Sequence, residues 1–200
     1  MKRSAVIGLI AANVLVYLWQ TFSPDFVEMS FALWPYPRVP GAPPFHFWQL
    51  VSYAFLHSTG NYTHLGFNML GLWMFGAPVE NALGAPRFLA IYFASVVTAA
   101  LTQLIVPSLL GAVPEATIGA SGGVFGLLLA FAMLFPKLRV VPLIPPIPMP
   151  AWLFATLYAL VELFLGVTGR MADVAHFAHL GGLVGSFLVM TQWRVQRSRR

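Results

Sequence analysis

One serine stands among four glycines at the head of a long apolar run, in the stretch Gly119-Ala120-Ser121-Gly122-Gly123-Val124-Phe125-Gly126. Glycines spaced four residues apart give a helix a flat face on which a second helix packs closely. A hydroxyl on that face is held against whatever the neighbouring helix carries. Because a histidine at hydrogen-bond distance can take the proton of a serine and make it a nucleophile, the stretch indicates covalent catalysis if such a histidine exists.

A second run mirrors the first, His179-Leu180-Gly181-Gly182-Leu183-Val184-Gly185-Ser186, with small residues again four apart. Two helices with such faces approach closely enough for Ser121 and His179 to share a hydrogen bond, with His179 as general base. His176, three residues earlier on roughly the same face, is an alternative base. His64 and Asn68, four residues apart and so on one helix face, supply donors for a tetrahedral oxyanion, together with the backbone N–H of Ser121.

The composition places these groups in a membrane. The chain has 200 residues, of which 58% are hydrophobic and 8% charged, whereas soluble domains carry about 25% charged residues. The net charge of +5 lies mostly at the chain ends and in short loops, which is typical of membrane topology signals and speaks against nucleic acid as a partner. The absence of cysteine excludes disulfides, a thiol nucleophile and a thiolate metal site.

A membrane-spanning helix needs about 20 mostly apolar residues, and the chain, taken as a single membrane domain over residues 1–200, offers six candidates. They cover residues 4–22, 61–83, 88–106, 118–135, 151–166 and 174–193. The segment 23–56, rich in proline and aromatic residues, is expected to lie in the outer leaflet. The proline-rich segment 136–150 is expected to be an extended, polyproline-like connector.

The positive charges orient these spans. With the N-terminus inside, nine basic residues fall on inside segments and two outside, as the positive-inside rule requires. The inside set is Lys2, Arg3, Arg87, Lys137, Arg139, Arg194, Arg197, Arg199 and Arg200, and the outside set is Arg38 and Arg170. This orientation brings Ser121, His179 and the His64/Asn68 pair into the same leaflet. Among the other histidines, His57 is expected to cap the second span and His46 to lie at the interface.

The quoted runs around Ser121 and His179, together with His57, His64-Leu65-Gly66-Phe67-Asn68 and Gly76-Ala77-Pro78-Val79-Glu80, resemble the rhomboid family of intramembrane serine proteases. The resemblance covers nearly the whole chain, with the motifs in family order. It implies a six-helix, all-α membrane bundle with an interfacial first loop and a Ser121–His179 dyad. It also implies an oxyanion site at His64, Asn68 and the Ser121 N–H, and single-span membrane proteins as substrates.

Supporting roles fall to Gly119, Gly122, Gly182 and Phe125. Phe125 stands where the family often has a tyrosine, so ring stacking on the histidine survives without the hydroxyl. Asp173 precedes His179 by six residues, about 9 Å along a helix, and cannot orient its ring. The histidine is therefore expected to be held by packing against Phe125. The fifth span and residues 167–173 are expected to gate substrate access.

Other classes fit less well. The order Ser121, Asp173, His179 matches an α/β-hydrolase triad, but no strand series surrounds the serine. A zinc protease would show His-Glu-x-x-His, which is absent, and no metal or cofactor is expected. A catalytically silent membrane-protein binder or a small transporter is the alternative, although no internal repeat typical of transporters is present. A bacterial inner membrane with both termini cytoplasmic is the expected location.

Overall fold

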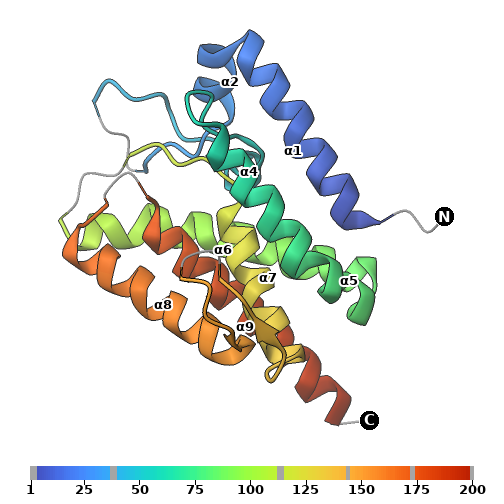
Figure 1. Ribbon diagram of the computed structural model, residues 1–200. Helices are drawn as coiled ribbons and strands as arrows, with labels where there is room; N and C mark the ends of the chain where they lie inside the picture. Colours follow the sequence, from blue (N-terminus) through green and yellow to red (C-terminus); the bar gives the residue numbers. More distant parts are fainter. Residues whose placement is uncertain (1–3, 37–39, 112–114, 143–144, 172–173, 199–200) are drawn as a thin grey trace.

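The protein is a helical bundle with one short hairpin (Figure 1). The structure, a computed structural model, describes residues 4–36, 40–111, 115–142, 145–171 and 174–198, with the side chains of the last helix described as far as residue 193. The elements are α1 (Ala5–Phe22), α2 (Pro24–Phe31), α3 (Gln49–Ser52), η1 (Tyr53–Phe55), α4 (Tyr62–Gly71), η2 (Leu72–Gly76), α5 (Ala77–Leu83), α6 (Ala85–Leu109), α7 (Ser121–Leu134), β1 (Arg139–Val140), β2 (Met149–Pro150), α8 (Ala151–Thr168) and α9 (His176–Ser198).

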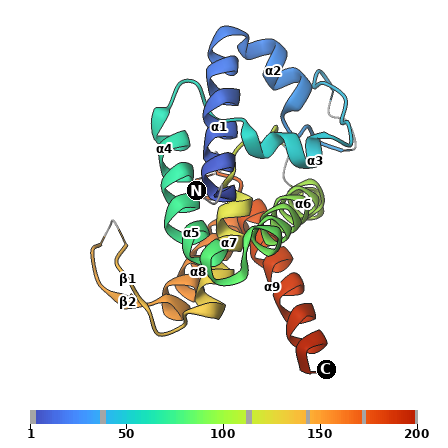
Figure 2. The same cartoon turned by 90° about the vertical axis from the view of Figure 1, so that its right-hand side faces the viewer.

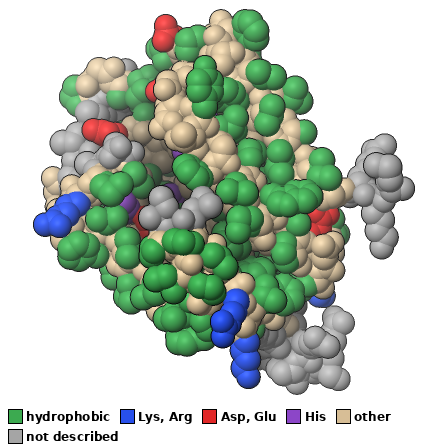
Figure 3. All heavy atoms as spheres, viewed as in Figure 1, with side chains coloured by type: hydrophobic (Ala, Val, Ile, Leu, Met, Phe, Trp, Pro, Cys, Tyr) green, Lys and Arg blue, Asp and Glu red, His purple; other side chains and the backbone are tan. Residues whose placement is uncertain are grey.

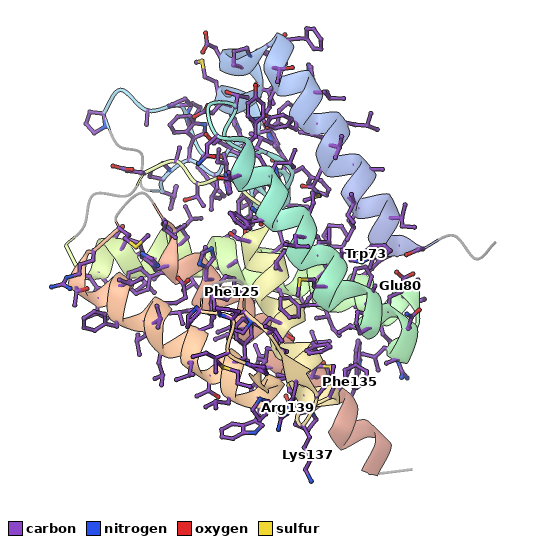
Figure 4. The ribbon with its side chains drawn as sticks, in the orientation of Figure 1. Trp73, Glu80, Phe125, Phe135, Lys137 and Arg139 are labelled. Atoms are coloured by element: carbon purple, nitrogen blue, oxygen red, sulfur yellow. The ribbon has the colours of Figure 1, made fainter. Side chains whose placement is uncertain are left out.

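The first helix is fastened to the end of the second expected span. The carboxylate of Glu80, on α5, accepts hydrogen bonds from the Ser4 hydroxyl at 2.9 Å and from the backbone N–H groups of Ala5 and Val6 at 2.8 and 3.0 Å. These N–H groups belong to the first turn of α1, where no intrahelical acceptor is available. Glu80 and the N-terminus of α1 therefore lie together (Figure 4).

Helix α1 is followed by a folded first loop. Between residues 23 and 56 the structure contains α2, α3 and η1, with Pro24 at the first position of α2, where a missing N–H is tolerated. The buried side chain of Gln49 accepts from the backbone N–H groups of Trp34 and His46 and so ties the loop to itself. The placement of this loop in the outer leaflet stays a prediction.

The second expected span is one helical run interrupted by a π-helical turn. It comprises α4, η2 and α5 over residues 62–83, and π turns of this kind are frequent near functional sites. Gly84, with φ of +81°, then reverses the chain into α6. That conformation favours glycine because it has no Cβ.

Helix α7 is the centre of the bundle. It contacts α4, η2 and α5 on one side, α8 on another, and packs along α6 and α9 (Figure 1). Close approach of α7 and α9 depends on glycine: a Cβ on Gly182 would collide with the backbone carbonyl of Gly122. A Cβ on Gly122 would likewise collide with the Cβ of Ala99, on α6. The small faces seen in the sequence are thus the contact surfaces of three helices.

The proline-rich connector differs from its expected extended form. Residues 139–140 and 149–150 pair as the antiparallel strands β1 and β2, with Arg139 opposite Pro150 and Val140 opposite Met149. Proline at the end of a two-stranded edge removes only one donor, which such an edge tolerates. The hairpin projects from the end of the molecule that lies away from α2 (Figure 2).

Three of the described helices are long and apolar enough to cross a membrane, namely α1, α6 and α8. The apolar helix α7 is shorter, at 14 residues. Many large apolar side chains of α1 and α8 are exposed, which a bilayer tolerates and water does not. The count of six spans stays a prediction.

Candidate active site

Ser121 and His179 meet where α7 crosses α9. The Ser121 Oγ lies 2.8 Å from the His179 Nε2, within the range for a hydroxyl donating to an imidazole nitrogen. The two residues are 58 positions apart in the chain. The glycine contact between Gly122 and Gly182 brings their backbones together, one residue after Ser121 and three after His179.

The serine lies at the first residue of α7, not one turn inside a helix as expected from the 118–135 span. The preceding residues are extended and are held by the first loop: Thr117 exchanges backbone hydrogen bonds with Leu33, and the Gly119 N–H donates to the carbonyl of Tyr53. The φ of Gly119 is +124°, which strongly favours glycine. This abrupt start leaves the Ser121 N–H among the helix N-terminal donors that have no intrahelical partner.

The ring of His179 stacks on that of an aromatic neighbour. The Phe125 and His179 rings stack with centroids 4.2 Å apart and an interplanar angle of 7°. Phe125 also meets Tyr158 of α8 at 5.7 Å between centroids, so it lies between α7 and the helices α8 and α9 (Figure 4). Stacking of this kind fixes the plane of the imidazole while leaving both nitrogens free to form hydrogen bonds.

Stacking is not the only contact that holds His179, because Glu162 of α8 lies at the Nδ1 edge of its ring. The Glu162 Oε2 is 2.9 Å from His179 Nδ1, and both side chains are about nine-tenths buried. The stacking on Phe125 that the sequence predicts is therefore present, but it is joined by a carboxylate that was not expected. Glu162 was not predicted as a partner because it lies on a different helix from His179 and is distant from it in the sequence. Asp173 lies outside the described residues.

His176 does not compete for the serine. Its Nδ1 lies 2.7 Å from the same Glu162 Oε2, and its Nε2 lies 3.2 and 3.1 Å from the carbonyls of Arg170 and Met171. Both nitrogens are thus engaged away from Ser121. The structure leaves His179 as the histidine in contact with the hydroxyl.

His64 and Asn68 face the same point from α4. The Ser58 N–H donates to His64 Nδ1 at 3.3 Å, so the neutral ring carries its proton on Nε2. That Nε2 faces Gly119, since a Cβ there would lie 2.8 Å from it and 3.8 Å from the Ser121 Oγ. The Asn68 amide donates one N–H to the His64 carbonyl at 2.8 Å and has a second N–H to offer.

His57 was expected to cap α4 but does not. Its ring instead packs against that of His64. The cap is Asn61, whose side chain accepts from the Thr63 N–H. His57 is fully buried, with its ring 5.1 Å from that of His64. Burial, followed by the proximity of His64, lowers the pKa of His57 to about 4, so this neighbour is uncharged at physiological pH. His46 stacks on Trp48 in the first loop.

Two cavities of different character open onto Ser121. One, of about 520 Å³, is lined by polar groups that include His64, Asn68, Glu115 and His179. The other, of about 440 Å³, is apolar and runs between α4 and α8, with Phe67, Leu70, Phe154 and Tyr158 among its walls. In the space-filling view, histidine side chains are visible in a hollow of the molecular surface (Figure 3).

Glu162, His176 and His179 also form a donor set of the type that zinc uses, with one ligand atom from each residue within 4.8 Å of the others. However, the two Nδ1 atoms lie 2.7 and 2.9 Å from a single carboxylate oxygen. Ligand atoms around a tetrahedral zinc ion are about 3.3 Å apart. Both observed distances are shorter than that spacing.

The architecture is that of a helical membrane protein with a partly buried serine–histidine pair. Residues 44–194 match the rhomboid domain. The chain is 36% identical over 134 residues to Rhomboid protein 1, mitochondrial, of Saccharomyces cerevisiae (66% of this chain, 38% of that protein). It is 29% identical over 140 residues to Rhomboid protease GluP of Bacillus subtilis (70% and 25%), and 26% identical over 196 residues to Rhomboid protease GlpG of Yersinia pestis (97% and 64%).

The chain therefore belongs to the rhomboid family, as its motifs had indicated, and is an integral membrane protein. The matched segments span less than two thirds of the length of each of these relatives.

Proposed function

We propose that the protein is an intramembrane serine endopeptidase in which Ser121 is the nucleophile and His179 the general base. The observation that carries the proposal is the 2.8 Å contact between Ser121 Oγ and His179 Nε2. Relatives from Bacillus subtilis and Yersinia pestis that are named rhomboid proteases support the reaction class.

The reaction follows from the positions of the groups. His179 Nε2 takes the hydroxyl proton as Ser121 Oγ attacks the scissile carbonyl, and the negative charge moves to the carbonyl oxygen. His179 then gives the proton to the leaving amine, and the acyl-enzyme forms. A water molecule, deprotonated by the same histidine, hydrolyses the ester and restores the serine.

We propose that the two reactants reach Ser121 through separate cavities. Water reaches Ser121 through the polar cavity, which contains Glu115 and His64. A membrane-embedded peptide reaches it through the apolar groove between α4 and α8. An apolar groove that opens beside a spanning helix suits a transmembrane segment, so we propose single-span membrane proteins as substrates.

Residues 1–200 form one rhomboid membrane domain of six spans in a lipid bilayer, with the first loop in the outer leaflet and both termini cytoplasmic, as the distribution of basic residues favours. A bacterial inner membrane fits this arrangement, although the yeast relative is named as mitochondrial. Thiol labelling of single cysteines at Lys137 and Ser58 from each side of the membrane tests the orientation.

Purified protein in detergent should cleave a fluorescent single-span substrate, and a fluorophosphonate should label Ser121. EDTA should leave both reactions unchanged, because the serine mechanism requires no metal. Peptide mass mapping identifies the labelled residue. If the protein neither cleaves nor is labelled, the proposal is wrong and a catalytically silent binder replaces it.

Closing the apolar groove should separate the two routes. The chain contains no cysteine, so Leu70→Cys and Tyr158→Cys, on opposite walls of the groove, can be bridged with a bifunctional thiol reagent. We expect cleavage of the membrane substrate to fall at least about tenfold, whereas labelling of Ser121 by the small phosphonate through the polar cavity persists. The unbridged double variant is the control. Equal cleavage before and after bridging would exclude this access route.

A further inference from the structure

We propose that Glu162 is a positioning residue that orients His179, so that the reaction centre is a Ser121–His179–Glu162 triad in which His176 shares the proton of the carboxyl group. The inference rests on the proposed function and deepens it. The chain reaches this arrangement across three helices, because Ser121 is on α7, Glu162 on α8 and both histidines on α9.

The geometry around His179 requires an acceptor at Nδ1. Its Nε2 accepts from the Ser121 hydroxyl, so the neutral ring carries its proton on Nδ1. That Nδ1 is buried, and the part of the chain that the structure describes offers it no well-aligned hydrogen bond. The Glu162 Oε2, 2.9 Å away but off the N–H direction, is the acceptor within reach.

The proton count explains how a carboxyl group is tolerated at this position. The carbonyls of Arg170 and Met171 can only accept, so His176 Nε2 must carry a proton. The 2.7 Å contact between His176 Nδ1 and Glu162 Oε2 then contains one further proton, held by the ring or by the carboxyl group. In either case the Glu162–His176 pair is neutral overall, which removes most of the penalty for a carboxylate in an apolar span.

A purely structural role does not account for both contacts. His176 already fastens the α8–α9 connection through its two backbone acceptors, and one bond from Glu162 to His176 would complete that fastening. The second approach of Glu162, to His179 Nδ1, adds nothing to the connection. It does hold the ring with Nε2 toward Ser121. When the shared proton is on the ring of His176, the carboxylate also places negative charge beside the imidazolium that forms during attack.

The test compares Glu162→Gln with Glu28→Gln, the same chemical change on the exposed helix α2. We expect Glu162→Gln to lower kcat about 10²-fold with KM little changed, and Glu28→Gln to have no effect. Glu162→Asp, which keeps the charge, should recover part of the loss. Thermal unfolding in detergent identifies any variant that fails to fold.

The pH profile distinguishes positioning from structure. The ionisable groups that face His179 in the described residues are Glu162 from α8, His176 from α9 and His64 from α4, with Glu115 in the same cavity. Without the carboxylate the imidazolium is less stable, so the pH of half-maximal activity on the acid side should fall in Glu162→Gln. An unchanged profile and kcat would overturn the proposal.

An NMR measurement tests the contact between His179 and Glu162 without depending on turnover. In protein labelled with ¹⁵N-histidine, the His179 Nδ1–H should give a low-field proton resonance that is lost in Glu162→Leu and in His179→Ala. Absence of the resonance in the wild type would overturn the inference even if cleavage is observed. Presence of the resonance in a protein that neither cleaves nor is labelled would sustain the contact and reject the proposed function.

Discussion

Ser121→Ala and His179→Ala should each abolish cleavage of a membrane substrate, with kcat reduced by about 10⁴-fold or more. The serine provides the atom that attacks, and the histidine takes its proton across 2.8 Å, so neither can act without the other. Because the two residues act as a unit, the double variant should be no slower than either single variant. Initial rates with a fluorescent single-span substrate in detergent measure this.

Two matched substitutions show whether the loss is specific. Ser186→Ala changes a buried serine in the mirrored glycine run of α9, which lines neither cavity at Ser121. His46→Ala changes a histidine that stacks on Trp48 in the first loop. Both should retain cleavage. Full activity in Ser121→Ala would reject the serine mechanism, and sensitivity of that activity to EDTA would point to a metal centre at Glu162, His176 and His179.

The meeting of Ser121 and His179 could be predicted from sequence because it depends on a property that sequence displays directly. Glycines every four residues mark helix faces that approach closely, and Gly122 and Gly182 do meet in the structure. One helix could be placed to within a few residues for the same kind of reason: the segment expected at 151–166 forms α8 at Ala151–Thr168. A long apolar run in the sequence indicates a helix whose side chains can face lipid.

Glu162 could have been predicted but was not. Glu162 is distant from His179 in the sequence, but α8 and α9 are joined by a short connection that brings residues on either side of it together. Glu162 and His176, separated by 14 positions, meet in this way. The available signal was a single carboxyl group within an otherwise apolar span, which is functional by default.

Other features depended on tertiary contacts that no local pattern shows. The start of α7 at Ser121, later than expected, is set by bonds from Leu33 and Tyr53 in the first loop. His57 seemed a helix cap from its position, but Asn61 is closer to the helix start and takes that role. Residues 139–140 pair with residues 149–150 although the segment is rich in proline, because only two residue pairs need to match.

Asn68→Ala should lower kcat by about 10²- to 10³-fold, which is the usual effect of removing one oxyanion donor. Asn68 lines both cavities that open onto Ser121. One of its N–H groups is fixed on the His64 carbonyl, which holds the amide in place and leaves the other for the substrate oxygen. Asn81→Ala, on α5, is the matched control and should not change the rate.

His64→Ala should lower kcat similarly, through Nε2, the nitrogen left protonated by the bond from the Ser58 N–H. Both losses should fall on kcat more than on KM, since a carbonyl oxygen draws closest to these donors only when it carries the negative charge of the tetrahedral intermediate. Phosphonate labelling of Ser121 should slow in parallel, because the reagent develops the same charge at the same point. A variant with raised KM, unchanged kcat and normal labelling would instead assign Asn68 or His64 to substrate binding in the ground state.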